Sequence, residues 1–306
     1  MKKCLIIPLL AALTASSPAA KDSPAYTSIE EATAAHPNFP MAGEYLSLDG
    51  KNAIQASMLS NGSFLVAQYR KGLPGDGWDQ SAIESSILPA DDLKALLEDF
   101  RKVERTSPTL GKPQPADALI RFPDDLSNVT AGIMAAGGKT LKDLGSFHMH
   151  LEFKLPFKPG ANPASQHRGN SGVYIFNNYE IQILDSFALD YEHPENNALH
   201  PESENKQWCG AFYKTKLPDL NMSYPPLRWQ TYDIDFTAPV FDGEAKVKNA
   251  RVTVRHNGVL IHNDVELTAG TGSGAKKPQL AKGPVFFQNH ANPVVFRNVW
   301  AAELKD

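Results

Sequence analysis

Cysteine is almost missing from this chain, which has only Cys4 and Cys209 among its 306 residues. Cys4 lies in a leader segment that we expect to be removed, so the mature chain cannot form an intramolecular disulfide. The fold must then be held by its core and its hydrogen bonds rather than by cross-links. For Cys209 the ordinary role is that of a buried, unreactive thiol.

The chain also lacks a large excess of positive or negative charge. Lys and Arg total 30 against 34 Asp and Glu, the net charge is −4 at pH 7, and no basic block occurs. Because nucleic acids are bound through clustered Lys and Arg, we expect no nucleic-acid partner.

The chain also lacks an apolar run long enough to cross a membrane. The longest such run, residues 4–15, falls short of the ~20 residues that a spanning helix needs. Lys2 and Lys3 precede it and small residues follow it, which is the pattern of a secretory signal peptide. We expect a signal peptide over residues 1–20, no membrane span, and an exported protein, periplasmic or secreted.

Several sequence motifs of well-known enzyme classes are absent. The chain contains no phosphate-binding loop, dinucleotide-binding fingerprint, paired-cysteine zinc motif or EF-hand loop. No serine stands in a nucleophile-elbow context. These absences leave carbohydrate chemistry or carbohydrate binding as the leading classes of function.

The residues that are present predict two parts. Residues 21–110 combine short alternating segments with turn signals such as Asn61-Gly62, and they contain an amphipathic segment near 90–104. In that segment apolar residues recur at helical spacing: Leu93, Leu96, Leu97, Phe100 and Val103. We therefore predict a small N-terminal α+β extension with one good helix.

Residues 117–304 show β patterning throughout. The segment "SFHMHLEFKLPF" alternates apolar and polar residues, and Asn257-Gly258 between two alternating runs is a strong hairpin signal. No helical period of useful length appears here. Many short antiparallel strands with long loops favour a jelly-roll β-sandwich, so the predicted fold class is all-β.

Polar residues on the strands are the first candidates for a site. In "YEIQIL", Glu180 and Gln182 share one strand face about 7 Å apart, and Asp185 joins them only if a β-bulge shifts the register. Sandwich enzymes that cleave β-glucans carry acids at this spacing. Gln182 in the middle position departs from the pair of carboxyls ~5 Å apart that a retaining glycosidase needs.

Histidines add to this polar set. His148, His150 and Glu152 share a face of one strand, and Gln288 shares a face with His290. Histidine suits proton transfer or metal ligation near neutral pH. The alternative is that these residues simply form a solvated sheet face.

Two residues in loops are candidates for substrate contacts. Trp208, in the segment "ENKQWCGAFY", could stack on the apolar face of a sugar ring. Arg168, just before the Gly169-Asn170 turn, could hold an anionic intermediate or pair with a neighbouring carboxylate.

Five blocks of this sequence together resemble the 3-keto-disaccharide hydrolase domain family. They are "RGNSGVYIFNNYEIQILDSF", "CGAFY", "PPLRWQTYDIDFTAPVF", "ARVTVRHNGVLIHNDVEL" and "GPVFFQNHANPVVFRNVW", in order within about residues 117–304. The resemblance implies a concanavalin A-like sandwich that cleaves glycosides already oxidised at C3. A separate sugar 3-dehydrogenase would then act upstream.

The resemblance also implies roles for the polar residues. The ketone makes the C2 proton acidic, so a base removes it, the C1 oxygen leaves and water adds back; direct hydrolysis is the other route. Glu180 or His290 would be the base and Asp185 would assist the leaving group. The sugar would be oriented by Arg168, Asn170, Gln182 and Gln288. A divalent cation could polarise the ketone, with candidate ligands Glu152, Glu180, His148, His150 and His290.

Three other functions remain open at this point. A non-catalytic carbohydrate-binding module would need aromatics and amides but not several titratable groups. An ordinary glucanase-like glycosidase would need a clean carboxylate pair. A cell-surface scaffold is poorly matched by a chain without repeats or an anchor.

Overall fold

The computed structural model describes residues 23–199 and 203–304. The predicted signal peptide, residues 1–20, lies outside these ranges. In the described part of the chain, none of the helices has the length and apolar character needed to cross a membrane.

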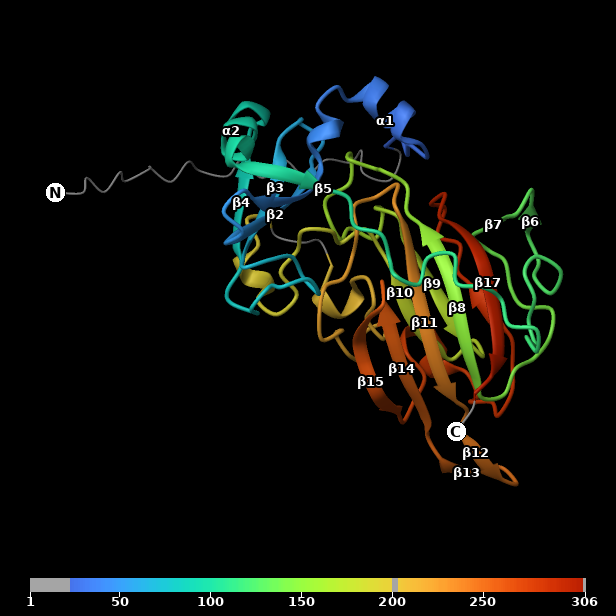
Figure 1. Cartoon of the computed structure of the whole chain (residues 1–306). Helices are drawn as coiled ribbons and strands as arrows, with labels where there is room; N and C mark the ends of the chain where they lie inside the picture. The colour runs from blue at the N-terminus through green and yellow to red at the C-terminus, as the bar shows by residue number, and fades with distance from the viewer. Residues whose placement is uncertain (1–22, 200–202, 305–306) are drawn as a thin grey trace.

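The N-terminal extension is built on a five-stranded antiparallel sheet with the strand order β4-β3-β2-β1-β5. Two short helices and two 3₁₀ turns accompany the sheet (Figure 1). The elements are α1 (Ile29–Ala35), η1 (Phe39–Met41), β1 (Gly43–Ser47), β2 (Asn52–Met58), β3 (Phe64–Arg70), β4 (Glu84–Leu88), α2 (Ala90–Leu96), η2 (Leu97–Asp99) and β5 (Phe100–Val103).

The helix predicted near residues 90–104 is too long. Helix α2 ends at Leu96, and after the η2 turn the chain becomes strand β5. Strand β5 pairs with β1, with Phe100 opposite Ser47. The helical spacing of the apolar residues was real, but backbone pairing along the open edge of β1 overrides a weak local preference.

The main body is a sandwich of two antiparallel sheets. The larger has the order β15-β14-β11-β8-β17-β7-β6 and the smaller β10-β9-β16. The larger sheet contains β6 (Val129–Thr130), β7 (Ile133–Ala135), β8 (Phe147–Lys154), β11 (Trp229–Thr237), β14 (Ala250–His256), β15 (Val259–Leu267) and β17 (Val295–Glu303). The smaller contains β9 (Ser171–Ile175), β10 (Tyr179–Ile183) and β16 (Val285–Phe287).

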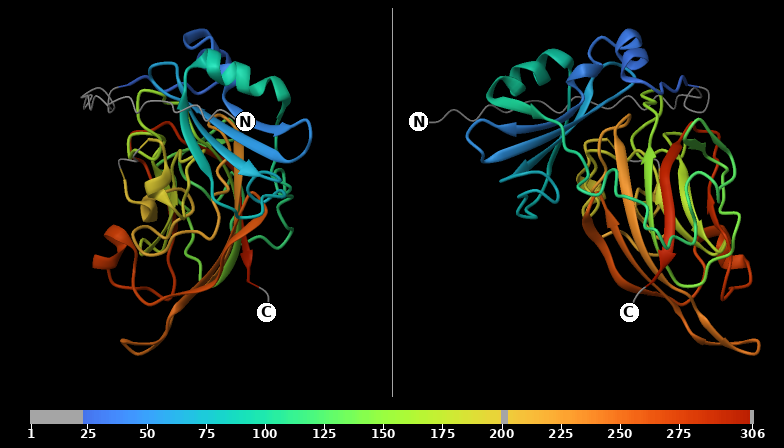
Figure 2. Two further views of the ribbon diagram at one scale, coloured as in Figure 1. Left: turned by 90° about the vertical axis from the view of Figure 1, so that its left-hand side faces the viewer. Right: turned by 45° about the vertical axis from the view of Figure 1, so that its right-hand side comes forward.

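The remaining elements lie in the connections of the sandwich. A hairpin of β12 (Val240–Asp242) and β13 (Ala245–Lys248) projects at the end away from the N-terminal extension (Figure 2). Three 3₁₀ turns lie in loops: η3 (Pro194–Asn196), η4 (Asn205–Gln207) and η5 (Gly272–Lys276). This all-β jelly-roll sandwich with an α+β extension confirms the predicted fold class.

Strand alternation decides which residues form the core and which face outward. Met149 and Leu151 of β8 pack in one cluster with Val173 of β9 and Ile181 of β10. Their odd-numbered positions therefore point between the two sheets, and the even-numbered positions point away. Cys209 is buried in this core beside the Tyr232 hydroxyl, 3.2 Å from Sγ, and burial raises the pKa of its thiol, as expected for an unreactive cysteine.

The N-terminal extension packs directly against the sandwich. Phe157 of the sandwich belongs to the same apolar cluster as Phe39 and Ile54, and Phe187 belongs to a second one with Tyr69. The extension is thus joined to the sandwich by shared cores rather than by a linker alone.

Candidate active site

The outer face of the small sheet carries a set of buried polar residues. Across β9 and β10, Glu180 pairs with Tyr174 and Gln182 pairs with Gly172. On the other side of β9, the backbone N–H of Gln288 donates to the backbone carbonyl oxygen of Gly172 at 2.8 Å. Three strands therefore bring these side chains into two adjacent rows on one face.

Glu180 is the titratable group of this face. Its carboxyl is 2% exposed, and Oε2 accepts a hydrogen bond from the Tyr174 hydroxyl at 2.6 Å. That hydroxyl also lies 3.2 Å from the Ser273 hydroxyl of η5. Burial raises the pKa of Glu180 to about 7, and the hydrogen bond from Tyr174 opposes part of this rise. A carboxyl with a pKa near neutrality is suited to accept and return protons.

Gly172 makes room for this carboxyl. A Cβ atom at position 172 would lie 2.6 Å from Glu180 Oε1, which is closer than atoms can approach. Oε1 of Glu180 therefore lies over the backbone of Gly172, while Oε2 accepts the hydrogen bond from Tyr174.

A chain of carboxamides continues the site beyond Gly172. Gln182 Nε2 donates to Asn170 Oδ1 at 3.4 Å and to the Gln207 carbonyl at 3.2 Å. Asn170 in turn donates to Gln166 Oε1 at 2.8 Å. Tyr213 donates to the side chain of Gln207 at 2.8 Å.

This network leaves buried polar atoms without partners. Gln166, Gln182 and Gln288 each keep one amide atom that is buried and makes no hydrogen bond within the described part of the chain. Buried polar groups are nearly always paired, so such atoms mark a place for a ligand or for water. Hydroxyl groups of a sugar, which both donate and accept, would complete all three.

Arg168 and Asp185 are not on this face. The Arg168 guanidinium is fully buried, and its Nε donates to Asp185 Oδ2 at 2.6 Å. Its other nitrogens donate to the carbonyl of Ala161 and, across to the N-terminal extension, to Ser57 Oγ at 3.1 Å. Strand β10 ends at Ile183, and Asp185 forms a buried ion pair with Arg168. This placement does not support the roles predicted for the two residues in holding the sugar and assisting the leaving group, which stay predictions.

Trp208 does not offer a stacking surface either. The side chain is fully buried, packs against Tyr191 with ring centroids 5.1 Å apart, and donates from Nε1 to Ser203. The sequence could not distinguish a loop tryptophan that covers sugar from one that fills a satellite core. Besides Tyr174, the half-buried ring of Tyr213 lies near Glu180.

His290 lies in the exposed loop that follows β16. Asn292 of the same loop accepts a hydrogen bond from the amide of Gly169, so this loop lies beside the turn that leads to Asn170. The structure therefore places His290 at the end of the polar face. It does not pair it with Glu180.

The predicted metal ligands do not converge. His150 and Glu152 point outward from β8 on the large sheet, whereas Glu180 points outward from the small sheet, with the core between them. His150 Nδ1 lies 3.0 Å from Asp233, and Glu152 accepts from Arg297, Asn298 and Gly111. His148 is paired with Asp235. Among residues 23–199 and 203–304, no group of three or more His, Cys, Asp or Glu is placed to hold a metal ion.

Sequence reasoning missed several residues of the polar face: Gln166, Gly172, Tyr174, Gln207 and Ser273. Tyr174 and Gly172 could have been found, because they alternate with Ser171 and Val173 along a strand that was recognised. Gln166, Gln207 and Ser273 come from loops whose course the sequence pattern does not predict.

Comparisons with known proteins bear on the sandwich. A family model described as the 3-keto-α-glucoside-1,2-lyase-like domain matches residues 130–302. A proposed glycosyl hydrolase from Parabacteroides distasonis is 28% identical, with a TM-score of 0.50 over 62% of this chain and 85% of its own. A second one from that organism is 19% identical, with a TM-score of 0.40 over 58% and 82%. No protein with a curated description matches significantly. The family match and the first of these structures support a glycoside-hydrolase-like function.

Proposed function

Since the chain belongs to the 3-keto-α-glucoside-1,2-lyase-like domain family, we propose that it cleaves glycosides whose sugar ring carries a ketone at C3. The observation that carries this proposal is Glu180, a buried carboxyl with a pKa of about 7. It lies on a face whose neighbouring carboxamides have unpartnered atoms.

The reaction follows from the acidity that the ketone confers. A C3 ketone acidifies the hydrogen on C2, because loss of that proton gives an enolate. In the proposed first step the Glu180 carboxylate takes this proton, and the electron pair of the C–H bond enters the enolate. The enolate then forms a C1–C2 double bond as the C1–oxygen bond breaks, and the departing oxygen is protonated by the Glu180 carboxyl or by water. Addition of water to the enone completes the cleavage.

A single carboxyl is sufficient for this route. A retaining glycosidase needs a second carboxyl at ~5 Å for a covalent intermediate, and position 182 holds glutamine. The elimination needs one base of suitable pKa and hydrogen bonds to the enolate oxygen. The unpartnered Nε2 of Gln166 is available to donate such a bond, and the unpartnered Oε1 atoms of Gln182 and Gln288 can accept from substrate hydroxyls.

We also propose where the substrate comes from. A 3-keto-glycoside forms when a dehydrogenase oxidises the C3 hydroxyl, so such an enzyme would act before this one. The signal-peptide pattern at residues 1–20 supports action outside the cytoplasm.

The test compares a 3-keto-glucoside with its unoxidised parent. The mature protein is incubated with each, with and without a chelator, and the released sugar is followed by mass spectrometry. Release from the keto substrate alone is expected. Release from the parent would make the protein an ordinary glycosidase, and binding without release from either would make it a carbohydrate-binding module.

Variants connect this activity to the site. Glu180→Gln is expected to abolish turnover and also the exchange of the C2 hydrogen with D₂O. Glu195→Gln, at an exposed carboxyl in η3, is the matched control and should keep full activity. Full turnover by Glu180→Gln would remove Glu180 from the mechanism.

A further inference from the structure

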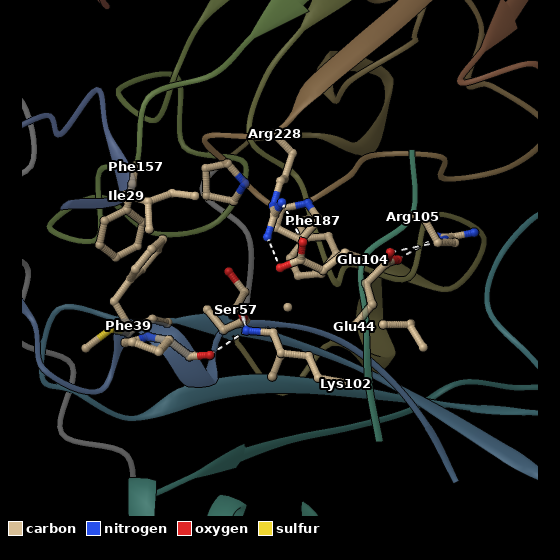
Figure 3. Close-up of a pocket in the computed structure, with 18 of the residues that line it drawn as sticks. Ile29, Phe39, Glu44, Ser57, Lys102, Glu104, Arg105, Phe157, Phe187 and Arg228 are labelled. Carbon is tan, nitrogen blue, oxygen red and sulfur yellow. Dashed lines mark hydrogen bonds and ion pairs between the residues drawn. The ribbon is translucent and has the colours of Figure 1, made fainter. Parts of the chain in front are cut away.

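A cavity of about 220 Å³ lies between the N-terminal extension and the sandwich, away from the polar face of the small sheet. Figure 3 shows residues from both parts around it, including Phe39 and Lys102 of the extension and Phe157 and Arg228 of the sandwich. Boundaries between structural units are frequent places for small-molecule sites.

One side of the cavity is apolar. The rings of Phe39 and Phe157 pack in a tilted arrangement with centroids 4.5 Å apart, and Ile29 lies next to them (Figure 3). Phe187 closes the inner end and is fully buried. This wall is suited to an apolar, preferably aromatic, body.

The other side carries charges, most of which are paired. Glu44 accepts two hydrogen bonds from Arg105, at 2.9 and 2.5 Å. Glu104 pairs with Arg228, and Asp185, behind the wall, pairs with Arg168. Three of the four cations that line the cavity thus have a carboxylate of their own.

Lys102 is the fourth cation, and within residues 23–199 and 203–304 it forms no ion pair with a carboxylate, although Glu104 is close enough to act on its charge. Its ammonium donates to the carbonyl oxygens of Pro40 and Ala42, the latter at 2.8 Å. An ammonium has three N–H donors, so one is left over from these carbonyls, and the Nζ atom also lies 5.8 Å from the centroid of the Tyr45 ring. Partial burial and the positive charge of Arg228 lower the pKa of Lys102, and the negative charge of Glu104 opposes part of this effect.

The cavity is open at this charged end. Lys102 and Glu104 are exposed residues at its mouth, whereas Ser57, Arg168 and Phe187 form a buried floor. A ligand can therefore enter with its apolar body first and leave an anionic group at the mouth.

We propose that this cavity is a binding site for a small organic anion, a carboxylate on an aromatic or similarly compact apolar body. The carboxylate pairs with Lys102 beside Arg228, and the apolar body lies against Phe39, Phe157 and Phe187. The site is separate from Glu180, so its occupation can be measured without turnover, and the result does not depend on the proposed function.

The test uses two probes of equal shape and different charge. Phenylacetate and phenylacetamide are titrated into the mature protein, and binding is followed by the methyl resonances of Ile29 and Met58, both of which line the cavity. Phenylacetate is expected to shift these signals and to bind at least about tenfold more tightly than the amide. Equal affinities, or no shift at millimolar phenylacetate, would overturn the proposal.

A pair of lysine variants identifies the counter-ion. Lys102→Met is expected to reduce phenylacetate affinity at least about tenfold while phenylacetamide binding changes little. Lys51→Met, at an exposed lysine paired with Asp49, is the control and should bind both probes as before. If loss of the contacts to Pro40 and Ala42 unfolds Lys102→Met, the relative affinities of phenylacetate and phenylacetamide for the unaltered protein still test whether the cavity binds an anion. Unchanged phenylacetate affinity in a folded Lys102→Met would contradict the assignment.

Discussion

The carboxyl of Glu180 lies over Gly172 of the neighbouring strand, at the spot that any side chain at position 172 would fill. A Cβ there would come within 2.6 Å of Oε1 and within 3.1 Å of Cγ of Glu180. The orientation of the proposed base therefore depends on the absence of one carbon atom in β9.

Replacing this glycine is expected to disable the site without unfolding the sandwich. Gly172→Ala should lower kcat/KM at least about a hundredfold, because Glu180 must turn away from its position to avoid the new methyl group. The free energy of unfolding should change by only about 1–3 kcal/mol, the usual cost of overpacking. Gly145→Ala, where the new Cβ would meet only the Lys282 side chain at 3.8 Å, is the control and should leave both kcat/KM and the free energy of unfolding unchanged. Enzyme kinetics and thermal denaturation measure the two effects.

The activity should depend on pH through Glu180. A base acts in its ionised form, so kcat/KM is expected to rise with pH and to level off above a midpoint near 7. Tyr174→Phe removes the hydrogen bond that lowers this pKa, so its midpoint should move to higher pH. Tyr213→Phe removes a hydroxyl that bonds Gln207 rather than Glu180 and should leave the midpoint in place. A profile that is flat from pH 5 to 9 would exclude Glu180 as the base.

The same carboxyl should reduce stability at high pH. Its pKa is raised from 4.5 to about 7 in the folded chain, so the unfolded chain gives up this proton first as pH rises. The folded state is therefore expected to lose up to about 3 kcal/mol between roughly pH 4.5 and 7, by the 1.4 kcal/mol that each pKa unit represents. Glu180→Gln should not show this part of the loss. Urea denaturation across this pH range compares the two proteins, and parallel curves would contradict the burial of the charge.

The ion pair of Arg168 and Asp185 should matter for stability and not directly for chemistry. Arg168→Met leaves the Asp185 carboxyl buried without its partner, which is expected to cost about 3–5 kcal/mol. Arg251→Met breaks an exposed pair with Asp264 and should change the free energy of unfolding little. Chemical denaturation measures both variants. A small effect of Arg168→Met would mean that the extension is not held through this residue.

Strand alternation predicted much of this molecule. It separated Glu180 and Gln182 from the core positions Ile181 and Ile183, and it placed His150 and Glu152 outward on β8. Such patterns describe one strand at a time. They could not show that Glu152 and Glu180 lie on opposite outer faces of the sandwich, because that depends on how two sheets stack.

Loops and ends of elements account for the remaining differences. Trp208 and Asp185 lie in irregular connections, where no repeating pattern of apolar residues distinguishes buried from exposed positions. The strand at Phe100–Val103 was hidden by an apolar spacing that fits a helix equally well. The sequence predicts that Arg168 can pair with a neighbouring carboxylate, but only tertiary contacts show that its partner is Asp185 and that Arg168 also donates to Ser57 of the extension.

The guanidinium of Arg168 has a consequence for how this protein can change over time. Its acceptors come from both parts of the chain, with Asp185 and Ala161 on one side and Ser57 on the other. A recombination event that transferred the sandwich alone would leave the Arg168 donor to Ser57 without its acceptor. It would also expose Phe157 and Phe187 to solvent. The extension and the sandwich are therefore expected to be inherited together, and a lineage that loses the first 105 residues should first replace the arginine.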